Sequence, residues 1–549
     1  MEHLLVETVV IIGNGMAGLT AAIHCRDKNK KVILVSVGAP EKSQSVMAMG
    51  GINAALNTKG ENDSVEQHYL DTMKAGCDIG DSASVEKLTK DAPEIIEWLD
   101  HLGVNFSRDS DGRVDVRRFG GQKNMRTAYA GARTGKQIMT ALISAVRECE
   151  VKKQIEVKIG WRLLEILKNN DSVCGVILIH RYTEEIIAIE ASALILAFGA
   201  PNGLFGKTTG SALNDGCAGG IAFESGLEFQ NLEMIQYHPT TINGGSKRIL
   251  ITEAARGQGG RLYIMRNGEP WYFMEEWYPE GGNLMPRDVV SRSIYKVCKE
   301  YNCSEVYLDL REIPKKVLNE KLDEVVSICD TFLHCNPHNK PIPVYPGIHY
   351  FMGGIKTDSF HQTNIKGIFA AGECSSQYHG ANRLGGNSTL GAIHGGMIAA
   401  AMACDFVNKN VSDQKRICEI AKEIAIKERD SRKGKTGYRP SNLIKEIADI
   451  MNSSLGIMRD EEQLRKAQKE LLECESKALE CSDDEGYYGY IWLLSSVCLA
   501  QGFIKSALER RESRGAHQRT DYPETKLEYK KNSIVSLVNG KITIRFGEI

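Results

Sequence analysis

The sequence has almost no net charge. Its 68 Lys and Arg residues are balanced by 70 Asp and Glu residues, which leaves a formal charge of -2. Proteins that bind nucleic acid or an anionic membrane through their overall field need a basic excess. We therefore predict no nucleic-acid binding and expect this chain to recognise its partners locally.

Long apolar runs and a leader are also lacking. The most apolar stretches, 397–407 and 490–504, are short or interrupted by polar residues, whereas a membrane span needs roughly 18 apolar residues. The N-terminus has an acidic residue at position 2 and enters a strand-like pattern at once, so no export signal is predicted. We expect a cytoplasmic protein without a membrane span, which associates with the cytoplasmic face of a membrane only through partner subunits.

Cysteine pairs with metal-ligand spacing are missing too. None of the 15 cysteines forms a C-x-x-C pair, and their odd number and scatter indicate free thiols. We therefore predict no iron–sulfur cluster in the chain itself. His334, Cys335 and His338 lie close together in a Pro/Asn loop but lack ligand-like spacing, so no metal site is predicted.

Glycine is abundant, with 53 residues in a chain of 549. Residues 6–12 form a β-branched run that leads into Gly13-Asn14-Gly15-Met16-Ala17-Gly18, followed by a helix-like stretch 19–27 and a second strand 31–36. G-x-G-x-x-G between strand and helix is typical of a turn whose N–H groups approach a pyrophosphate. The second strand ends at Ser36 and not at an acidic residue, which favours FAD over NAD.

Further patterns predict an α/β fold with four parts. Apolar strands at 193–197 and 368–371, each followed by a glycine turn, should join the first two strands in one sheet. This predicts a Rossmann-like FAD-binding domain over 1–230 and 350–405, with an inserted α+β capping domain over 231–349. Helical spacing, for example of Ile417, Ile420 and Ile424, predicts a helical domain over 406–515. Alternation around Asn539-Gly540 predicts a hairpin in a C-terminal segment, 516–549.

Five clusters combine His, Arg, Glu and Gly: 237–240, 252–260, 286–288, 349–354 and 379–388. Together with Gly50-Gly51-Ile52-Asn53 and the late segment 512–517, and in this order, they resemble the flavoprotein subunit of the succinate dehydrogenase and fumarate reductase family. The resemblance runs from Val9 to about Pro523. It implies an enzyme that acts on a CH–CH bond of a dicarboxylate.

Reduction of a C=C bond between two carboxylates requires clamps at both ends, a hydride donor on one face and an acid at the other carbon. The resemblance implies that His349 and Arg383 hold one carboxylate, and that His238 and Thr252 hold the other. It makes Arg287 the proton donor, with Glu253 and Arg256 relaying the replacement proton.

The resemblance also implies the FAD contacts. These are Gly13, Gly15 and Gly18 at the pyrophosphate, Ser36 and Asp215 at the adenosine, Glu373 at the ribityl chain, and Ser388 and Thr389 at the isoalloxazine, with Ser43, Gln44, Ser45, Gly50, Gly51 and Asn387 alongside. Membrane-bound relatives carry a covalently linked His in the segment that reads Ser43-Gln44-Ser45-Val46 here. Because glutamine cannot form that bond, we expect non-covalent FAD of lower potential, which favours fumarate reduction over succinate oxidation.

The leading interpretation is the catalytic subunit of a fumarate reductase that forms succinate with electrons from an iron–sulfur subunit. L-Aspartate oxidase is a similar family that also binds FAD without a covalent link. Asn382-Arg383-Leu384-Gly385-Gly386-Asn387 favours the reductase, since aspartate oxidases tend to have Met-Ala-Ser between that Arg and Asn, and Met352-Gly353-Gly354 points the same way. A third alternative, a flavoprotein that only carries electrons, would need no substrate clamp.

Overall fold

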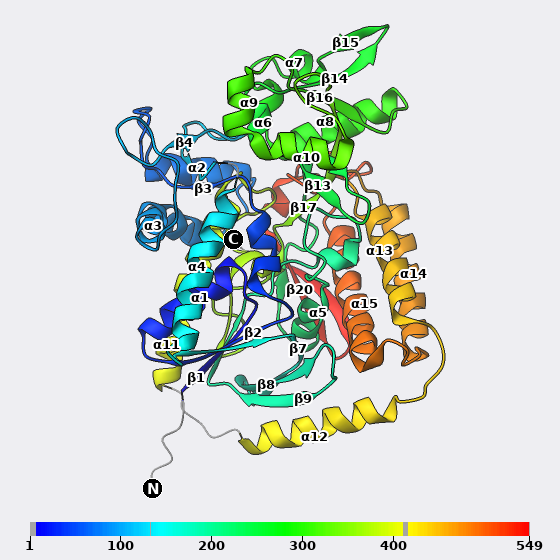
Figure 1. Cartoon of the computed structure of the whole chain (residues 1–549). Helices are drawn as coiled ribbons and strands as arrows, with labels where there is room; N and C mark the ends of the chain where they lie inside the picture. Colours follow the sequence, from blue (N-terminus) through cyan, green and yellow to red (C-terminus); the bar gives the residue numbers. More distant parts are fainter. Residues whose placement is uncertain (1–6, 132, 410–414, 548–549) are drawn as a thin grey trace.

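A five-stranded parallel sheet forms the base of the structure, a computed structural model that describes residues 7–131, 133–409 and 415–547 (Figure 1). Its strands lie in the order β19 (Ile368–Ala370), β10 (Ala193–Leu196), β1 (Thr8–Ile12), β2 (Lys31–Ser36) and β6 (Ile155–Ile159). The central strand β1 is buried along its whole length, with Ile11 opposite Ile195 and Leu34. Burial on both faces explains why these strands are continuous apolar runs.

Helices cover one face of this sheet, and an antiparallel sheet covers the other (Figure 1). The helices on the sheet are α1 (Met16–Asp27), α4 (Thr134–Val151) and α11 (Asn387–Lys409), and outside them α3 (Ser82–His101) packs on α11 and α2 (Val65–Ala75) packs on α3. The opposite sheet comprises β7 (Trp161–Asn169), β8 (Ser172–His180) and β9 (Ile186–Glu190), and a small sheet comprises β3 (Ile52–Asn53), β5 (Thr127–Ala128) and β4 (Val116–Arg117). The glycine turn thus places the N-terminus of α1 at the carboxyl edge of the parallel strands.

A six-stranded antiparallel sheet with its own helices caps that edge, at the top of Figure 1. Its strands lie in the order β13 (Arg248–Leu250), β12 (Ile235–Asn243), β17 (Ile342–Phe351), β16 (Val306–Asp309), β14 (Arg261–Arg266) and β15 (Glu269–Trp271). Its helices are α6 (Ala254–Gly257), α7 (Phe273–Trp277), α8 (Arg287–Glu300), α9 (Lys315–Lys321) and α10 (Asp323–Leu333). Because β17 leads back through β18 (Gly354–Ile355) into β19, the cap is an insertion in the base.

The remaining helices and the C-terminal hairpin pack beside the base. They are α5 (Cys217–Glu224), α12 (Lys415–Ser431), α13 (Pro440–Ser454), α14 (Glu461–Leu479) and α15 (Gly486–Glu509). The hairpin of β20 (Asn532–Val538) and β21 (Lys541–Gly547) extends a sheet with β11 (Phe229–Gln230) and β18. Its turn residues Asn539 and Gly540 both have positive φ, as a two-residue hairpin turn requires. The α/β class with cap and helical region is confirmed, whereas the domain limits stay predictions.

Two helices are longer and more apolar than the sequence patterns indicated. Residues 387–407 of α11 and α15 are each long and apolar enough to cross a membrane by length and composition. In the structure 61% and 67% of these windows are buried, as in core helices of globular proteins. The estimate that both stretches were too short was therefore wrong, because small and polar residues inside the helices do not interrupt them.

A buried ion-pair network ties the cap to the C-terminal segment. Glu233, just before β12, accepts hydrogen bonds from Arg510 Nε at 2.5 Å and from Ser533 Oγ at 2.8 Å. Arg510 in turn donates to Glu512 Oε1 at 3.0 Å and to two backbone carbonyls near the hairpin. Glu233, Arg510 and Glu512 are each 0% exposed, so every charge in the network needs its partner.

We expect Glu233→Ala to lower the free energy of unfolding by about 3–5 kcal/mol, because it leaves the buried Arg510 without its main counter-charge. Thermal and denaturant unfolding followed by circular dichroism would measure the change. Glu509→Ala, which removes an exposed ion pair with Lys505 from α15, is the matched control and should cost below about 1 kcal/mol. Equal effects of both substitutions would contradict this reading of the network.

Candidate active site

One continuous cavity runs from the glycine turn at the carboxyl edge of the parallel sheet to the underside of the cap. Its lining runs from the end of β1, the first strand of the base along the chain, to the residues after β19, the last one. Of the residues expected from the sequence, those that line it are Gly13, Gly15, Ser36, Ser43, Gln44, Ser45, Gly50, Gly51, Asp215, His238, Thr252, Glu253, Arg287, His349, Glu373, Arg383, Ser388 and Thr389.

Three expected residues lie behind the wall of this cavity. A Cβ on Gly18 would lie 1.8 Å from the Gly13 carbonyl oxygen, so this glycine serves the close packing of α1 on the turn. The Asn387 side chain donates to Thr72 Oγ1 at 2.9 Å and accepts from Asn53 Nδ2 at 2.7 Å. Arg256 lies behind Glu253. The resemblance implied a cofactor contact for Gly18 and Asn387, whose motifs are contiguous with residues that do face the cavity, whereas it implied for Arg256 a proton relay through Glu253, and that role stays a prediction.

An ion pair between Arg287 and Glu253 occupies the cap side of the cavity. Arg287 begins α8 and donates through Nε to Glu253 Oε2 at 2.8 Å, and Nη2 lies 2.7 Å from the same oxygen. Glu253 Oε1 accepts from the Gly120 amide at 2.8 Å and lies 3.8 Å from Arg256 Nη2. Burial raises the pKa of Glu253, but Arg287 and Arg256 outweigh it and bring that pKa below its ordinary value. The carboxylate is therefore ionised.

Arg383 faces the same space from the opposite side. Its guanidinium carbon lies 4.3 Å from the centroid of the Tyr350 ring, and its Nη2 donates to Gln236 Oε1 at 3.0 Å. Burial, followed by the charge of Arg287, lowers the pKa of Arg383 to about 9. Its Nε is buried without a hydrogen-bond partner among the described residues, so a donor remains for a ligand.

Gln236 is a residue that sequence reasoning missed. Its Oε1 accepts from both Arg383 and, at 3.1 Å, Arg287 Nη1. Its Nε2 donates to Asn382 Oδ1 at 2.8 Å, which fixes the orientation of the amide. The available signal was its spacing of two from His238, since alternate residues of a strand share a face.

His238 and His349 come from the paired strands β12 and β17, and their ring centroids lie 5.1 Å apart. His238 Nδ1 accepts from the Thr240 amide at 3.3 Å, which puts the proton of the neutral ring on Nε2. His349 Nδ1 is 2.8 Å from Thr209 Oγ1. Burial, then the charge of Arg287, holds both pKa values well below their usual range. Both rings are neutral and leave Nε2 for a ligand.

The substrate end of the cavity therefore carries excess positive charge. Arg287, Arg383 and Arg256 are at most 8% exposed, and Glu253 is the ionised carboxylate among them. The two histidines are neutral, and burial raises the pKa of Glu373 to about 7. One ionised carboxylate and a Glu373 that is only partly ionised near neutral pH do not compensate three guanidinium charges, which is unfavourable in a buried site unless a ligand supplies negative charge. The arrangement is built to receive a small dianion.

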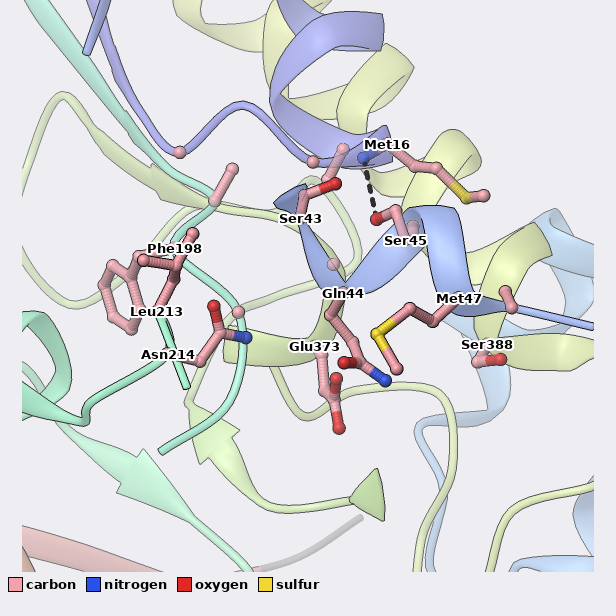
Figure 2. Close-up of a pocket in the computed structure, with 18 of the residues that line it drawn as sticks. Met16, Ser43, Gln44, Ser45, Met47, Phe198, Leu213, Asn214, Glu373 and Ser388 are labelled. Atoms are coloured by element: carbon pink, nitrogen blue, oxygen red, sulfur yellow. Dashed lines mark hydrogen bonds between the residues drawn. The ribbon is translucent and has the colours of Figure 1, made fainter. Parts of the chain in front are cut away.

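The other end of the cavity fits a dinucleotide. Ser45 Oγ accepts from the Met16 amide at 3.1 Å at the start of α1, where the turn residue Gly13 has a φ of 116° (Figure 2). Ser43 Oγ and Gln44 Oε1 are buried without hydrogen-bond partners among the described residues. Figure 2 shows Gln44 directed into the cavity beside Glu373 and Met47. Orphaned polar groups around a glycine turn suit FAD, whose pyrophosphate would lie at the N-terminus of α1.

Within residues 7–131, 133–409 and 415–547, no group of three His, Cys, Asp or Glu residues is arranged to hold a metal ion. His338 instead lies 3.3 Å from Asn319 Oδ1.

Comparisons with known proteins cover nearly the whole chain. The FAD binding domain family matches residues 8–389, and the fumarate reductase flavoprotein C-terminal family matches residues 444–548. A succinate dehydrogenase flavoprotein subunit of Bacillus subtilis is 37% identical, with 94% of this chain and 92% of that protein covered. A fumarate reductase (CoM/CoB) subunit of Methanothermobacter marburgensis is 34% identical, with 98% of each covered. The solved quinol fumarate reductase of E. coli superposes with a TM-score of 0.90 at 29% identity, over 99% of this chain and 96% of that one.

Glu373 gives the flavin-free protein a pH-dependent stability. Burial raises the pKa of Glu373 from 4.5 to about 7 in the folded chain. The stability that its protonated form gives the folded chain is therefore fully present below pH 4.5 and is lost as the pH rises through 7. Glu373→Gln should therefore be more stable than the parent at pH 8, by up to about 3 kcal/mol, and the difference should vanish near pH 4.5. Unfolding midpoints of flavin-free protein from pH 4.5 to 8 would measure it, with exposed Glu462→Gln as control. A difference that does not change with pH would contradict the burial of an ionisable carboxyl here.

Proposed function

Because the chain belongs to the flavoprotein subunits of the succinate dehydrogenase and fumarate reductase family, we propose that it reduces fumarate to succinate on non-covalently bound FAD. The family makes it an FAD-dependent oxidoreductase that acts on a CH–CH bond. The single observation that supports a dicarboxylate as the substrate is the excess of guanidinium charge at the cap side of the cavity. A dicarboxylate with two negative charges neutralises it.

The two carboxylates have separate sets of donors. Arg383, with its free Nε, and His349 hold one of them. His238, through Nε2–H, and the buried hydroxyl of Thr252 hold the other. Neutral histidines are useful here because they donate to a carboxylate without adding charge. These contacts orient the C=C bond and accommodate negative charge that develops on a carboxylate during reduction.

Bound FAD supplies a hydride, so the protein must supply a proton to the other carbon. Arg287 is the group in place, although a guanidinium ordinarily has a pKa above about 12. The Glu253 carboxylate accepts hydrogen bonds from Nε and Nη2 of Arg287, so it is in place to return a proton once one has been transferred. Arg256 lies next to Glu253 and extends this relay, through which a replacement proton from solvent reaches Arg287.

Gln44 supports non-covalent FAD and the direction of the reaction. By the resemblance, Gln44 stands at the sequence position of the linking His of membrane-bound relatives, and glutamine has no nucleophilic nitrogen to form that bond. Without the link the flavin potential is lower, and a lower potential favours electron flow to fumarate.

An iron–sulfur subunit is the proposed source of electrons. The fifteen cysteines are free thiols spread over all parts of the structure, and the described residues contain no ligand cluster. The relatives are named as flavoprotein subunits of larger enzymes, which supports electron supply by another chain. Contact through that partner would bring the protein to the cytoplasmic face of a membrane.

The two half-reactions of the flavin distinguish the proposal from L-aspartate oxidase. With the flavin reduced under anaerobic conditions, fumarate should restore the absorption of oxidised flavin, whereas L-aspartate should not bleach the oxidised protein. The reason is charge, since the ammonium group of aspartate would enter a cavity that already holds excess positive charge. Bleaching by aspartate without reoxidation by fumarate would assign the oxidase instead.

Substitution of the proton donor should separate turnover from binding. Arg287→Gln keeps a hydrogen bond donor beside Glu253 but removes the acid, so kcat for fumarate should fall by about 10²–10⁴-fold, with a much smaller change in KM. Arg292→Gln, five residues further along α8 and paired with Asp288, is the matched control. A loss confined to KM would mean that Arg287 binds the substrate and does not protonate it.

A further inference from the structure

Three segments far apart in the sequence meet at the adenosine end of the cavity. Arg162 is on β7, Asp215 precedes α5, and Tyr488 is on α15, and all three line the cavity. Their place follows from the sheet register, because Ser36 at the end of β2 pairs with Ile159 at the end of β6, just before β7. We call Arg162, Asp215 and Tyr488 the adenosine clamp.

The clamp residues hold one another tightly. Arg162 Nη1 donates to Asp215 Oδ2 at 2.6 Å, and Tyr488 OH donates to the same oxygen at 3.0 Å. The Arg162 guanidinium lies over the Tyr488 ring, 3.8 Å from its centroid. Trp492, one turn further along α15, donates to the Asp215 backbone oxygen at 3.1 Å. The carboxylate is thereby fixed in place and neutralised.

Ser36 has little capacity left for a ribose. Its hydroxyl donates to the Gly38 oxygen at 2.8 Å and accepts from Asn14 Nδ2 at 2.7 Å. Asp215 retains an acceptor position, since a carboxylate can accept about four hydrogen bonds. Oδ2 accepts the two already described, and Oδ1 accepts one from the Cys217 amide at 3.0 Å.

We propose that Arg162 and Tyr488 are positioning residues for the adenosine half of FAD: they hold Asp215, for which the resemblance already implies an adenosine contact, so that its carboxylate accepts a ribose hydroxyl. Asp215 then takes the role of the acidic residue that dinucleotide folds place at the end of the second strand, where this chain has Ser36. Because Tyr488 and Trp492 belong to α15, binding of the dinucleotide also stabilises the packing of that helix on the base. The inference rests on the proposed non-covalent FAD, for which retention by contacts alone is necessary.

Binding of ADP to flavin-free full-length protein isolates this end of the site, because ADP lacks the flavin. Isothermal titration should show that Arg162→Gln weakens ADP and FAD by about 10- to 100-fold, and Tyr488→Phe by about 3- to 10-fold. Arg162→Lys should recover part of the loss, since it keeps the charge but not the planar stack. Hydrogen exchange should show that ADP protects α15 in the parent and protects it less in Arg162→Gln.

The matched control is Arg432→Gln. Arg432 stacks on Tyr490, two residues along α15 from Tyr488, at 3.6 Å from the ring centroid, and neither residue lines the cavity. Unchanged ADP affinity in Arg162→Gln and Tyr488→Phe, or an equal loss in Arg432→Gln, would overturn the clamp. Tyr488→Phe removes a single oxygen, so it tests the clamp even where Arg162→Gln fails to fold.

A separate measurement tests the premise. Denaturation of the flavin-loaded protein should release all flavin from the polypeptide. Flavin that stays attached would contradict the proposed non-covalent FAD, while the ADP titrations would still decide whether the clamp binds adenosine.

Discussion

The ion pair of Glu253 with Arg287 is the interaction on which the arrangement of the site depends. It holds a buried carboxylate against the guanidinium of the first residue of α8, and both line the cavity. A single carboxylate keeps the neighbouring arginines together without neutralising them, because Arg256 shares it and Arg383 does not. A second carboxylate here would neutralise the arginines itself, and the negative charge of the proposed substrate would no longer be needed.

The fold provides this arrangement by inserting the cap between two strands of the base. The chain leaves the base after β11, contributes His238 and Glu253 from the cap, and returns through β17 with His349. Arg383 then comes from the base itself. Gln236 joins the two sides, since its one carbonyl oxygen accepts from an arginine of the cap and from one of the base. Position of the cap and geometry of the site are therefore coupled.

Local patterns predicted much of this organisation, because strands buried on both faces and a glycine turn leave strong marks in sequence. Residues whose role depends on a distant partner are harder to find. Arg162 and Tyr488 act through contacts with residues far away along the chain, and periodicity carries no such information. For Gln236 the strand spacing indicates only a face shared with His238, not its contacts with two arginines. The spacing of Ile420 and Ile424 correctly indicates helix α12, yet both side chains are about half exposed, at 48% and 52%. The spacing of apolar residues identifies an amphipathic helix, but only the folded structure shows which residues pack against its apolar face.

The two ends of the cavity treat charge differently, and this difference matches the different lifetimes of their ligands. At the end where we propose that adenosine binds, Arg162 and Asp215 neutralise each other, so the affinity proposed there comes from oriented hydrogen bonds and from the N-terminus of α1, which suits a retained cofactor. At the cap end the guanidiniums remain uncompensated until a dianion arrives. Electrostatic attraction of this kind speeds association, and product of the same charge is displaced by fresh substrate. The same cavity can thus hold a retained cofactor and an exchanging substrate, because its charges are neutralised at one end and uncompensated at the other.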